Sequence, residues 1–475
     1  MQVNYAQQLN SIYKQIFLFF WLIIICNVGY SQDSHYYSQQ PDSKGNLMGG
    51  TGTAGSRGLA AIFYNPGIVA LFDESNIGLN GSLYSYDIIK ISDKENSNRL
   101  EGSNVQVMPS LFAGTFKWKK NDRLTTSYAY LNTGYYSNIL SAQNYLEFTE
   151  NGTEHFSLDR YDIRTKYHED WVGSGISYRI NEHWGIGVVP FLHFYTVQYM
   201  QRSFANVGAK DQGSDFKSGK EDFREARLFS PALVFNVGIV YSKGNHEFGL
   251  TVISPRINLT YFAYSTVERT TSEYQNNNEV SKSVFIDPDF RAYLKRPLEL
   301  NFGYSYTKSN KSISFRLSYY TGYDSYKMGF ESNESIRNGI FKNADQFGFL
   351  PVSSNSNTLN LGVGFYHNLR PDFKLVGGFR TDFTFFNRGL YNFYDFTTVL
   401  VHWNLYHFSL GVDWQYKWLN LNTGVDYAMS YDKNISQFIE TEDLLKPYTE
   451  MRLADDARVA YNQIKLFLGL VLSIN

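Results

Sequence analysis

The stretch LELNFGYSY, from Leu298 to Tyr306, alternates without a break between apolar and polar side chains. Its apolar set is Leu298, Leu300, Phe302, Tyr304 and Tyr306, and its polar set is Glu299, Asn301, Gly303 and Ser305. A period of two residues is that of a β-strand, because successive side chains of a strand point to opposite faces. The stretch therefore predicts a strand with one aromatic, apolar face and one polar face.

The same pattern recurs to the end of the chain, which is rich in strand-favouring aromatic residues, with 38 Tyr and 37 Phe among 475 residues. It predicts about fourteen strands, at residues 76–91, 104–118, 123–137, 170–179, 184–203, 228–242, 247–268, 296–307, 312–323, 356–366, 373–384, 399–415, 418–431 and 460–474. Polar faces that carry Glu299, Arg316 and Asp426 opposite continuous apolar faces indicate a wet lumen with lipid outside, rather than a water-soluble sandwich.

The spacing between these strands alternates between short and long. The short turns are 119–122, 180–183, 243–246, 308–311, 367–372 and 416–417, and the expected long loops are 92–103, 138–169, 204–227, 269–295, 324–355, 385–398 and 432–459. Within the last loop, Thr441–Leu445 and Glu450–Tyr461 are predicted to be locally helical. Short turns on one side and long loops on the other are typical of a transmembrane antiparallel β-barrel of the Gram-negative outer membrane. The fold class predicted is therefore all-β, with the barrel at residues 76–475.

Residues 1–31 form a predicted signal peptide. The apolar run from Ile16 to Val28 is too short to span a bilayer comfortably and suits a secretory signal. Cys26, the only cysteine, lies inside this run, so the mature chain is expected to contain no disulfide and no cysteine-ligated metal.

Residues 32–75, between the signal and the first strand, are unlike the rest of the chain. They contain GTAGSRGLAAIFYNPG, from Gly52 to Gly67, which is small and apolar and ends in turn chemistry at Asn65, Pro66 and Gly67. Small residues allow a backbone to fold compactly in a confined space. The segment is therefore predicted to fold back into the barrel lumen as a plug.

This motif resembles the N-terminal hatch of the FadL/TodX long-chain fatty acid and hydrocarbon transporters, which typically leads to Asn-Pro-Ala. ISYRINEHWGIGV (Ile176–Val188) and RPLELNFGYSY (Arg296–Tyr306) are similar to the family as well. The chain departs from the family pattern at Gly67, where Ala is usual, and at its end, which lacks the terminal aromatic residue of many barrels. The resemblance implies a fourteen-stranded barrel closed by a hatch whose motif residues here are Gly52, Gly55, Arg57, Asn65, Pro66 and Gly67.

The resemblance further implies passive uptake of a hydrophobic small molecule, which enters among the outer loops and leaves sideways through the barrel wall. Pro109, inside a predicted strand, is expected to mark a kink, a bulge or a strand end, since proline cannot donate to a β-ladder. The ligand-binding residues are unknown at this level. The alternative is a non-transporting barrel of the same family that serves as an adaptor in protein export and holds a protein partner at its outer loops.

Other chemistry finds little support in the sequence. The net charge of -2 gives no electrostatic reason to bind nucleic acid. His407, Ser409 and Asp413 share one strand face, predicted to be lumenal, but their spacing alone does not define a catalytic site. No metal-ligand spacing occurs among the nine His. We therefore predict no enzyme activity, no catalytic residue, no metal and no cofactor, and for Arg57 either a salt bridge that holds the hatch or a contact with a ligand carboxylate.

Overall fold

The computed structural model describes residues 35–36, 39–55, 58–92, 99–150, 153–209, 216–275, 278–330, 352–386, 403–437 and 454–474. The predicted signal peptide, Arg57 and the predicted helix at Thr441–Leu445 lie outside these residues.

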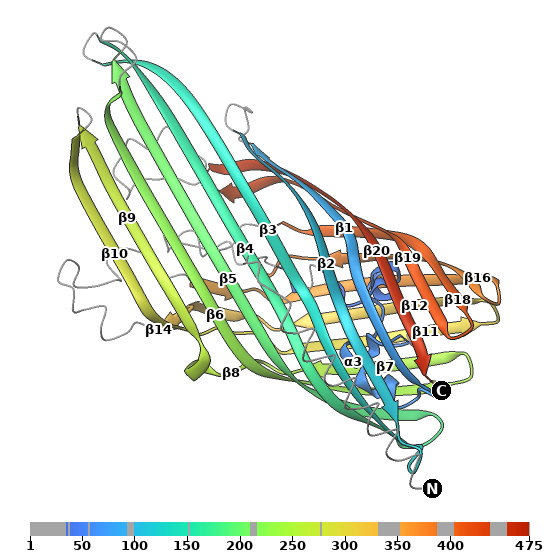
Figure 1. Ribbon diagram of the computed structural model, residues 1–475. Helices are drawn as coiled ribbons and strands as arrows, with labels where there is room; N and C mark the ends of the chain where they lie inside the picture. Colours follow the sequence, from blue (N-terminus) through green and yellow to red (C-terminus); the bar gives the residue numbers. More distant parts are fainter. Residues whose placement is uncertain are drawn as a thin grey trace.

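The strands close into an antiparallel barrel of fourteen strands over the described part of the chain, which confirms the predicted fold class (Figure 1). Closure occurs where the first and last strands pair, from Ser75 opposite Ile474 to Ser92 opposite Arg458. The strands are β1 Ser75–Ser92, β2 Arg99–Lys117, β3 Leu124–Glu150, β4 Thr153–Arg179, β5 Trp184–Ala209, β6 Phe216–Lys243, β7 His246–Ile253, β8 Ile257–Asn258, β9 Tyr264–Gln275, β10 Asn278–Ala292, β11 Glu299–Lys308, β12 Lys311–Tyr320, β13 Tyr323–Lys327, β14 Gly329–Phe330, β15 Val352–Asn355, β16 Thr358–Arg370, β17 Phe373–Asp382, β18 Leu405–Tyr416, β19 Leu419–Gln437 and β20 Ala454–Ile474.

Some barrel strands are built from more than one element. β6 pairs in turn with β7, β8 and β9, so these three occupy one position in the wall. β10 pairs with β9 and β11 pairs with β7, so β10 and β11 occupy the next position. β13 and β15 form a separate two-stranded sheet.

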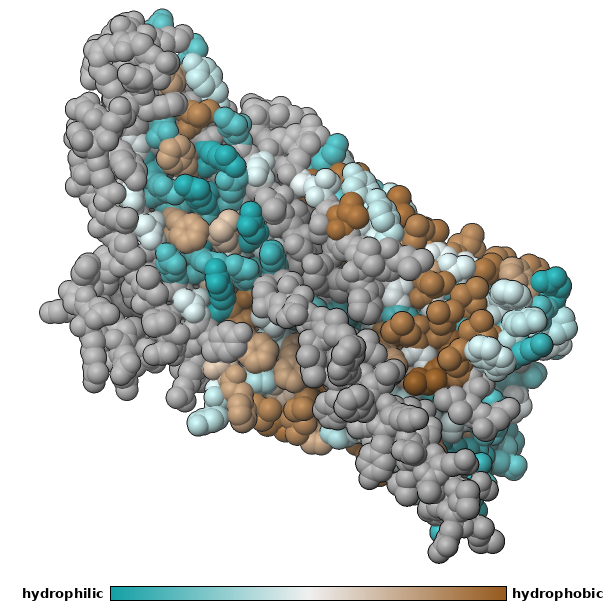
Figure 2. All heavy atoms as spheres, viewed as in Figure 1, coloured by the Kyte–Doolittle hydropathy of each residue, from teal (hydrophilic) through white to brown (hydrophobic). Residues whose placement is uncertain are grey.

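The two faces of the strands are those that the alternation predicts. In β11, Glu299 and Asn301 are buried in the interior, whereas Leu300 and Phe302 are exposed on the outside. Figure 2 shows the result as hydrophobic surface around the lower and right-hand parts of the wall. The burial of the polar face in a lumen is what distinguishes this barrel from a soluble β-sandwich.

Three of the predicted long loops, 138–169, 204–227 and 269–295, are wrong, because strands continue through them. The predicted loops 92–103 and 432–459 are wrong in part, because β2 begins at Arg99, β19 ends at Gln437 and β20 begins at Ala454. β3 and β4 pair without leaving the ladder up to Glu150 and Thr153, and β5, β6, β9 and β10 extend in the same way (Figure 1). β6 has 28 residues, whereas about 9–11 residues suffice to cross a membrane. Beyond the lipid a strand can be polar on both faces, as in the Arg202–Glu221 ion pair between β5 and β6, so polar composition there does not indicate a loop. The helix predicted at Glu450–Tyr461 is also wrong over Ala454–Tyr461, which belongs to β20.

The segment between Gln39 and Phe72 lies inside the barrel and contains three short helices, α2 Ser43–Leu47, α3 Ala61–Tyr64 and α4 Pro66–Val69 (Figure 1). A single turn of 3-10 helix, η2, covers Thr260–Phe262. None of the helices in the described residues is long and apolar enough to cross a membrane.

Candidate functional site: the barrel lumen

The sequence Asn65-Pro66-Gly67 fixes the N-terminal segment to the lumenal wall. Asn65 caps α4, with its Oδ1 accepting from Gly67 N at 3.0 Å, and Pro66 occupies the first turn, where its missing N–H is not needed. The Asn65 Nδ2 donates to Thr53 O at 2.9 Å and to Ile239 O of β6 at 3.0 Å. The carbonyl of Pro66 accepts from Ser177 Oγ of β4 at 2.7 Å.

Gly67, where the family resemblance leads one to expect Ala, approaches the wall too closely for a side chain. A Cβ at this position would lie 2.8 Å from Gly238 O and 2.9 Å from Gly185 O. The wall strands also contribute glycines at this contact. Glycines of β5, β7, β11, β16 and β17 lie so close to backbone atoms of the N-terminal segment that a Cβ would clash with them. These are Gly185, Gly187, Gly249, Gly303, Gly362, Gly364 and Gly378, here called the glycine ring.

The structure also describes the other two glycines of the predicted hatch motif, Gly52 and Gly55. Gly52 lies against the Tyr64 ring, where a Cβ would overlap it, and Gly55 has a φ of +76°, a backbone conformation that favours glycine. The Gly55 N–H donates to Glu247 Oε1 of β7 at 2.6 Å. Both glycines therefore allow the segment to adopt its compact conformation against the barrel wall.

Polar contacts attach the helix α2 to the opposite wall. Lys44 Nζ lies 3.2 Å from Asp413 Oδ2 of β18, and this carboxylate raises the pKa of Lys44. Asp42 caps α2 by accepting from Gly45 N at 2.8 Å, and burial raises its pKa to about 6. Arg316 of β12 donates to Gly50 O at 3.0 Å.

The lumen has an apolar half and a polar half. Helices α3 and α4 pack in one buried cluster with the lumenal residues of β2–β7, namely Leu111, Ala113, Ala129, Leu131, Trp171, Val189, Phe191, Val234, Val240 and Ile253. Phe63 lies at the centre of this apolar wall, with ring centroids 5.6 Å from Trp171 and 6.3 Å from Phe191. Across the lumen, β11–β20 present buried charged groups, including Arg380, His407 and Asp426. On the β2–β7 side, buried charged groups such as Glu169 and Glu247 lie beside the apolar cluster.

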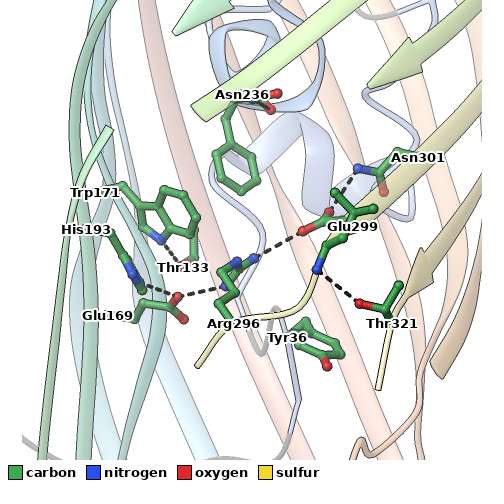
Figure 3. Close-up of polar contacts among 12 residues, drawn as sticks. Tyr36, Thr133, Glu169, Trp171, His193, Asn236, Arg296, Glu299, Asn301 and Thr321 are labelled. Carbon is green, nitrogen blue, oxygen red and sulfur yellow. Dashed lines mark hydrogen bonds and ion pairs between the residues drawn. The ribbon is translucent and has the colours of Figure 1, made fainter. Parts of the chain in front are cut away.

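A buried chain of charges crosses between the two halves (Figure 3). Arg296, just before β11, lies 3.1 Å from Glu169 of β4 and 3.1 Å from Glu299 of β11. Glu169 also contacts His193 Nε2 at 2.6 Å and accepts from the Tyr167 hydroxyl. We refer to Glu169, Arg296 and Glu299 as the brace, because the three side chains connect strands on different sides of the lumen.

A narrow cavity lies beside the brace. Its volume is about 50 Å³, too little for a hydrocarbon chain. Its lining is rich in tyrosine and cationic groups: Tyr36, Tyr167, Tyr195, Tyr323, Tyr326, Arg256, Lys295 and Arg296. Tyr36, one of the lining residues, stacks on Tyr320 with the ring centroids 3.9 Å apart. An organic ligand could bind here only if side chains that line the cavity moved.

The hydrogen-bonded ladder between β2 and β3 is interrupted. Their ladder runs from Lys117 opposite Thr125 to Leu111 opposite Leu131, and the next pair is Glu101 opposite Ser141. Both strands carry irregularities at the start of this interval: β2 shifts register against β1 between Leu111 and Pro109, and β3 shifts against β4 between Asn132 and Gly134. The predicted residue Pro109 thus lies at a bulge. We call the interval of 102–110 and 132–140 the wall opening.

Thr133 connects the wall opening to the lumen. Its Oγ1 accepts from Trp171 Nε1 at 2.9 Å, and its carbonyl accepts from Gln39 N of the N-terminal segment at 3.3 Å. The Arg296 guanidinium lies over the Trp171 ring at 4.8 Å. The brace, the segment and the edge of the opening are therefore in direct contact.

The residues weighed as a catalytic group are lumenal, as their strand parity predicts. His407 and Asp413 are buried; His407 Nδ1 lies 2.9 Å from Asp426 and 2.8 Å from Arg380, whereas Ser409 donates to Leu47 O at 3.0 Å. They hold the wall and the segment together. The sequence places Glu299 on the polar face of its strand but does not predict the brace, since nothing local links Glu169 with Arg296, 127 positions later.

No protein-family model and no curated protein sequence matches the chain. Solved structures do match. The crystal structure of a Pseudomonas aeruginosa FadL homologue matches with a TM-score of 0.62 and 11% identity, covering 93% of this chain and 100% of its own. The P. putida toluene transporter TodX matches at 0.56 and 11%, covering 91% and 98%, and the Ralstonia pickettii toluene transporter TbuX at 0.54 and 12%, covering 91% and 98%. The chain thus has the fold of the FadL/TodX-type transporters that its hatch motif resembles.

Proposed function

We propose that the protein is an outer-membrane transporter that takes up hydrophobic small molecules passively and delivers them into the membrane through the wall opening. The observation that carries this proposal is the position of the opening, which is bordered by Leu111 and Leu131 of the apolar wall. An apolar molecule that leaves the lumen there stays in apolar surroundings, and partition into lipid favours release by about 0.8 kcal/mol per methylene.

The N-terminal segment, residues 32–75, serves in this proposal as the hatch. It fills the lumen where an aqueous pore would otherwise run, and the glycine ring allows its backbone to lie directly on the wall. Such a plug excludes water-soluble solutes while the apolar wall remains available beside α3. Two of the solved structures that share the fold, TodX and TbuX, are toluene transporters, which supports a small-molecule cargo rather than catalysis. Long-chain fatty acids and hydrocarbons are the two cargo classes that we propose.

Mass spectrometry of apolar molecules extracted from protein purified out of outer membranes tests the proposal. The control is a variant lacking residues 33–67, whose folding is checked by its heat-dependent migration in detergent gels. A stoichiometric fatty acid or hydrocarbon on the intact protein, absent from the folded variant, is the expected result. An intact barrel that is empty and fails to raise uptake of toluene or a long-chain fatty acid contradicts it.

One observation favours the second candidate, an adaptor in protein export. β3–β6 continue well beyond the length needed to cross lipid and carry polar surface there (Figure 2). The extended sheet offers a protein partner a larger contact surface than the outer loops alone would offer. A barrel that contains no apolar molecule but retains one exported protein in fixed stoichiometry supports the adaptor instead.

A further inference from the structure

A groove lies at the end of the barrel that carries the short turns, between the β11–β12 hairpin and the β16–β17 hairpin. It has a volume of about 700 Å³ and is open to the outside of the barrel. Its wall includes the outward-facing side chains Ile313 and Phe365, which are 41% and 44% exposed. The lower part of the groove is therefore apolar and faces the region that lipid tails occupy.

The rim of the groove is basic. Lys308 and Lys311 form the last pair of the β11–β12 ladder, directly opposite each other, and both line the groove. Like charges opposite one another in a ladder are unfavourable, and among the described residues neither lysine lies in an ion pair. His367, in register with Lys311, has an Nδ1 without a hydrogen-bond partner in the part of the chain that the structure describes. The rim lacks an anion.

The level of the groove in the membrane follows from the aromatic residues at the same end. Trp118, Trp184, Trp414 and Trp418 are exposed beside the other short turns, and Trp and Tyr collect where the hydrocarbon meets the headgroups. Tyr306 belongs to this belt and lines the groove. The two lysines therefore lie at headgroup level, and Ile313 and Phe365 lie one step deeper.

We infer that this groove binds one anionic phospholipid of the periplasmic leaflet, with the phosphate between Lys308 and Lys311 and an acyl chain along Ile313 and Phe365. A free phosphate would satisfy the lysines but would leave the apolar part of the groove unused. The inference does not depend on what passes through the lumen, because the groove is on the outer surface.

The test compares lipid retention by native mass spectrometry after reconstitution in phosphatidylglycerol or phosphatidylcholine vesicles of the same acyl composition. Wild-type protein is expected to retain one phosphatidylglycerol, and Lys308→Gln/Lys311→Gln to lose about tenfold of this retention, since each cation at an anionic leaflet adds to the attraction. The matched control is Lys243→Gln/Lys417→Gln, which removes the same charge at two other short turns and is expected to retain the lipid. Phe365→Ala is expected to weaken retention with both lysines intact.

Each of the following outcomes overturns the inference: equal retention by the Lys308/Lys311 variant and the wild type, equal retention of phosphatidylcholine, or loss of lipid in the Lys243/Lys417 control to the same extent. Inorganic phosphate that binds at the lysines without lipid and displaces phosphatidylglycerol would show a free-anion site and would also overturn it.

Discussion

The indole N–H of Trp171 donates to the hydroxyl of Thr133 at 2.9 Å, and this bond joins the interior of the barrel to the strand that borders the wall opening. Trp171 contacts Phe63 of the N-terminal segment and lies under Arg296 of the brace. We therefore expect a ligand that displaces any of these groups to weaken the support of β3 at the opening.

Thr133→Val removes the acceptor and leaves the Trp171 N–H buried without a partner. An unsatisfied buried donor costs about 1–3 kcal/mol, so we expect faster hydrogen exchange in residues 132–140. Thr165→Val is the matched control, because Thr165 is also buried on the neighbouring strand but its Oγ1 has no partner in the described residues. Equal exchange rates in the two variants would show that the bond does not hold β3.

Arg296→Met leaves Glu169 and Glu299 as buried carboxylates with one cation fewer. Breaking a buried ion pair from one side typically costs about 3–5 kcal/mol, and we expect a loss of this order in the free energy of unfolding in urea. Arg202→Gln breaks the exposed pair with Glu221 and is expected to change it by less than about 1 kcal/mol. If the two variants had the same free energy of unfolding, the brace would not stabilise the fold.

Gly249→Val places a side chain where the carbonyl of Thr53 lies. We expect the barrel to form but the N-terminal segment to be unseated, which protease cleavage within residues 39–72 would detect. In the control Gly377→Ala, the three atoms nearest to the new Cβ all belong to the movable ring of Phe365. If the segment in Gly249→Val resisted protease as well as in the wild type, the close backbone contact at Gly249 would not be needed to hold the segment in place.

The pH dependence of the segment follows from Asp42. Its pKa in the folded protein, about 6, is raised by burial above the ordinary 3.8. Protonated Asp42 therefore stabilises the N-terminal segment in its position inside the barrel. This stabilisation is fully present below pH 3.8 and is lost as the pH rises through 6. We expect the opening free energy of the amides in 43–48, from hydrogen exchange corrected for intrinsic rates, to be larger at pH 5.5 than at pH 7.5. Asp42→Asn should remove the difference, and an opposite trend in the wild type would refute the assignment.

The sequence was most informative where lipid imposes a pattern. The alternation in Leu298–Tyr306 correctly predicted which side chains face the lumen, since a membrane-spanning strand must present apolar groups to lipid. Outside the lipid that constraint ends, so the polar composition of 138–169 wrongly predicts a loop where the structure has strands. The brace was not predictable, because Glu169 and Arg296 meet only through closure of the barrel. The wall opening was predictable only as an irregularity at Pro109, since one strand alone does not reveal whether its neighbour pairs with it.

The most direct test of the central claim is to close the wall opening. Ser103→Cys/Ile139→Cys places cysteines at positions that would pair if the β2–β3 register continued between its two ends. Cys26, the only cysteine of the chain, lies in the predicted signal peptide, so the mature protein offers no competing thiol. The matched control is Lys166→Cys/Gln198→Cys, which links β4 and β5 where they are already paired.

The measurement is uptake of labelled toluene and of a labelled long-chain fatty acid, before and after oxidation or bridging with a short bis-maleimide. We predict that the link across the wall opening lowers uptake to background, that reduction of the disulfide restores it, and that the control link has no effect. Full uptake through a barrel whose opening is shown by mass spectrometry to be cross-linked would contradict lateral release.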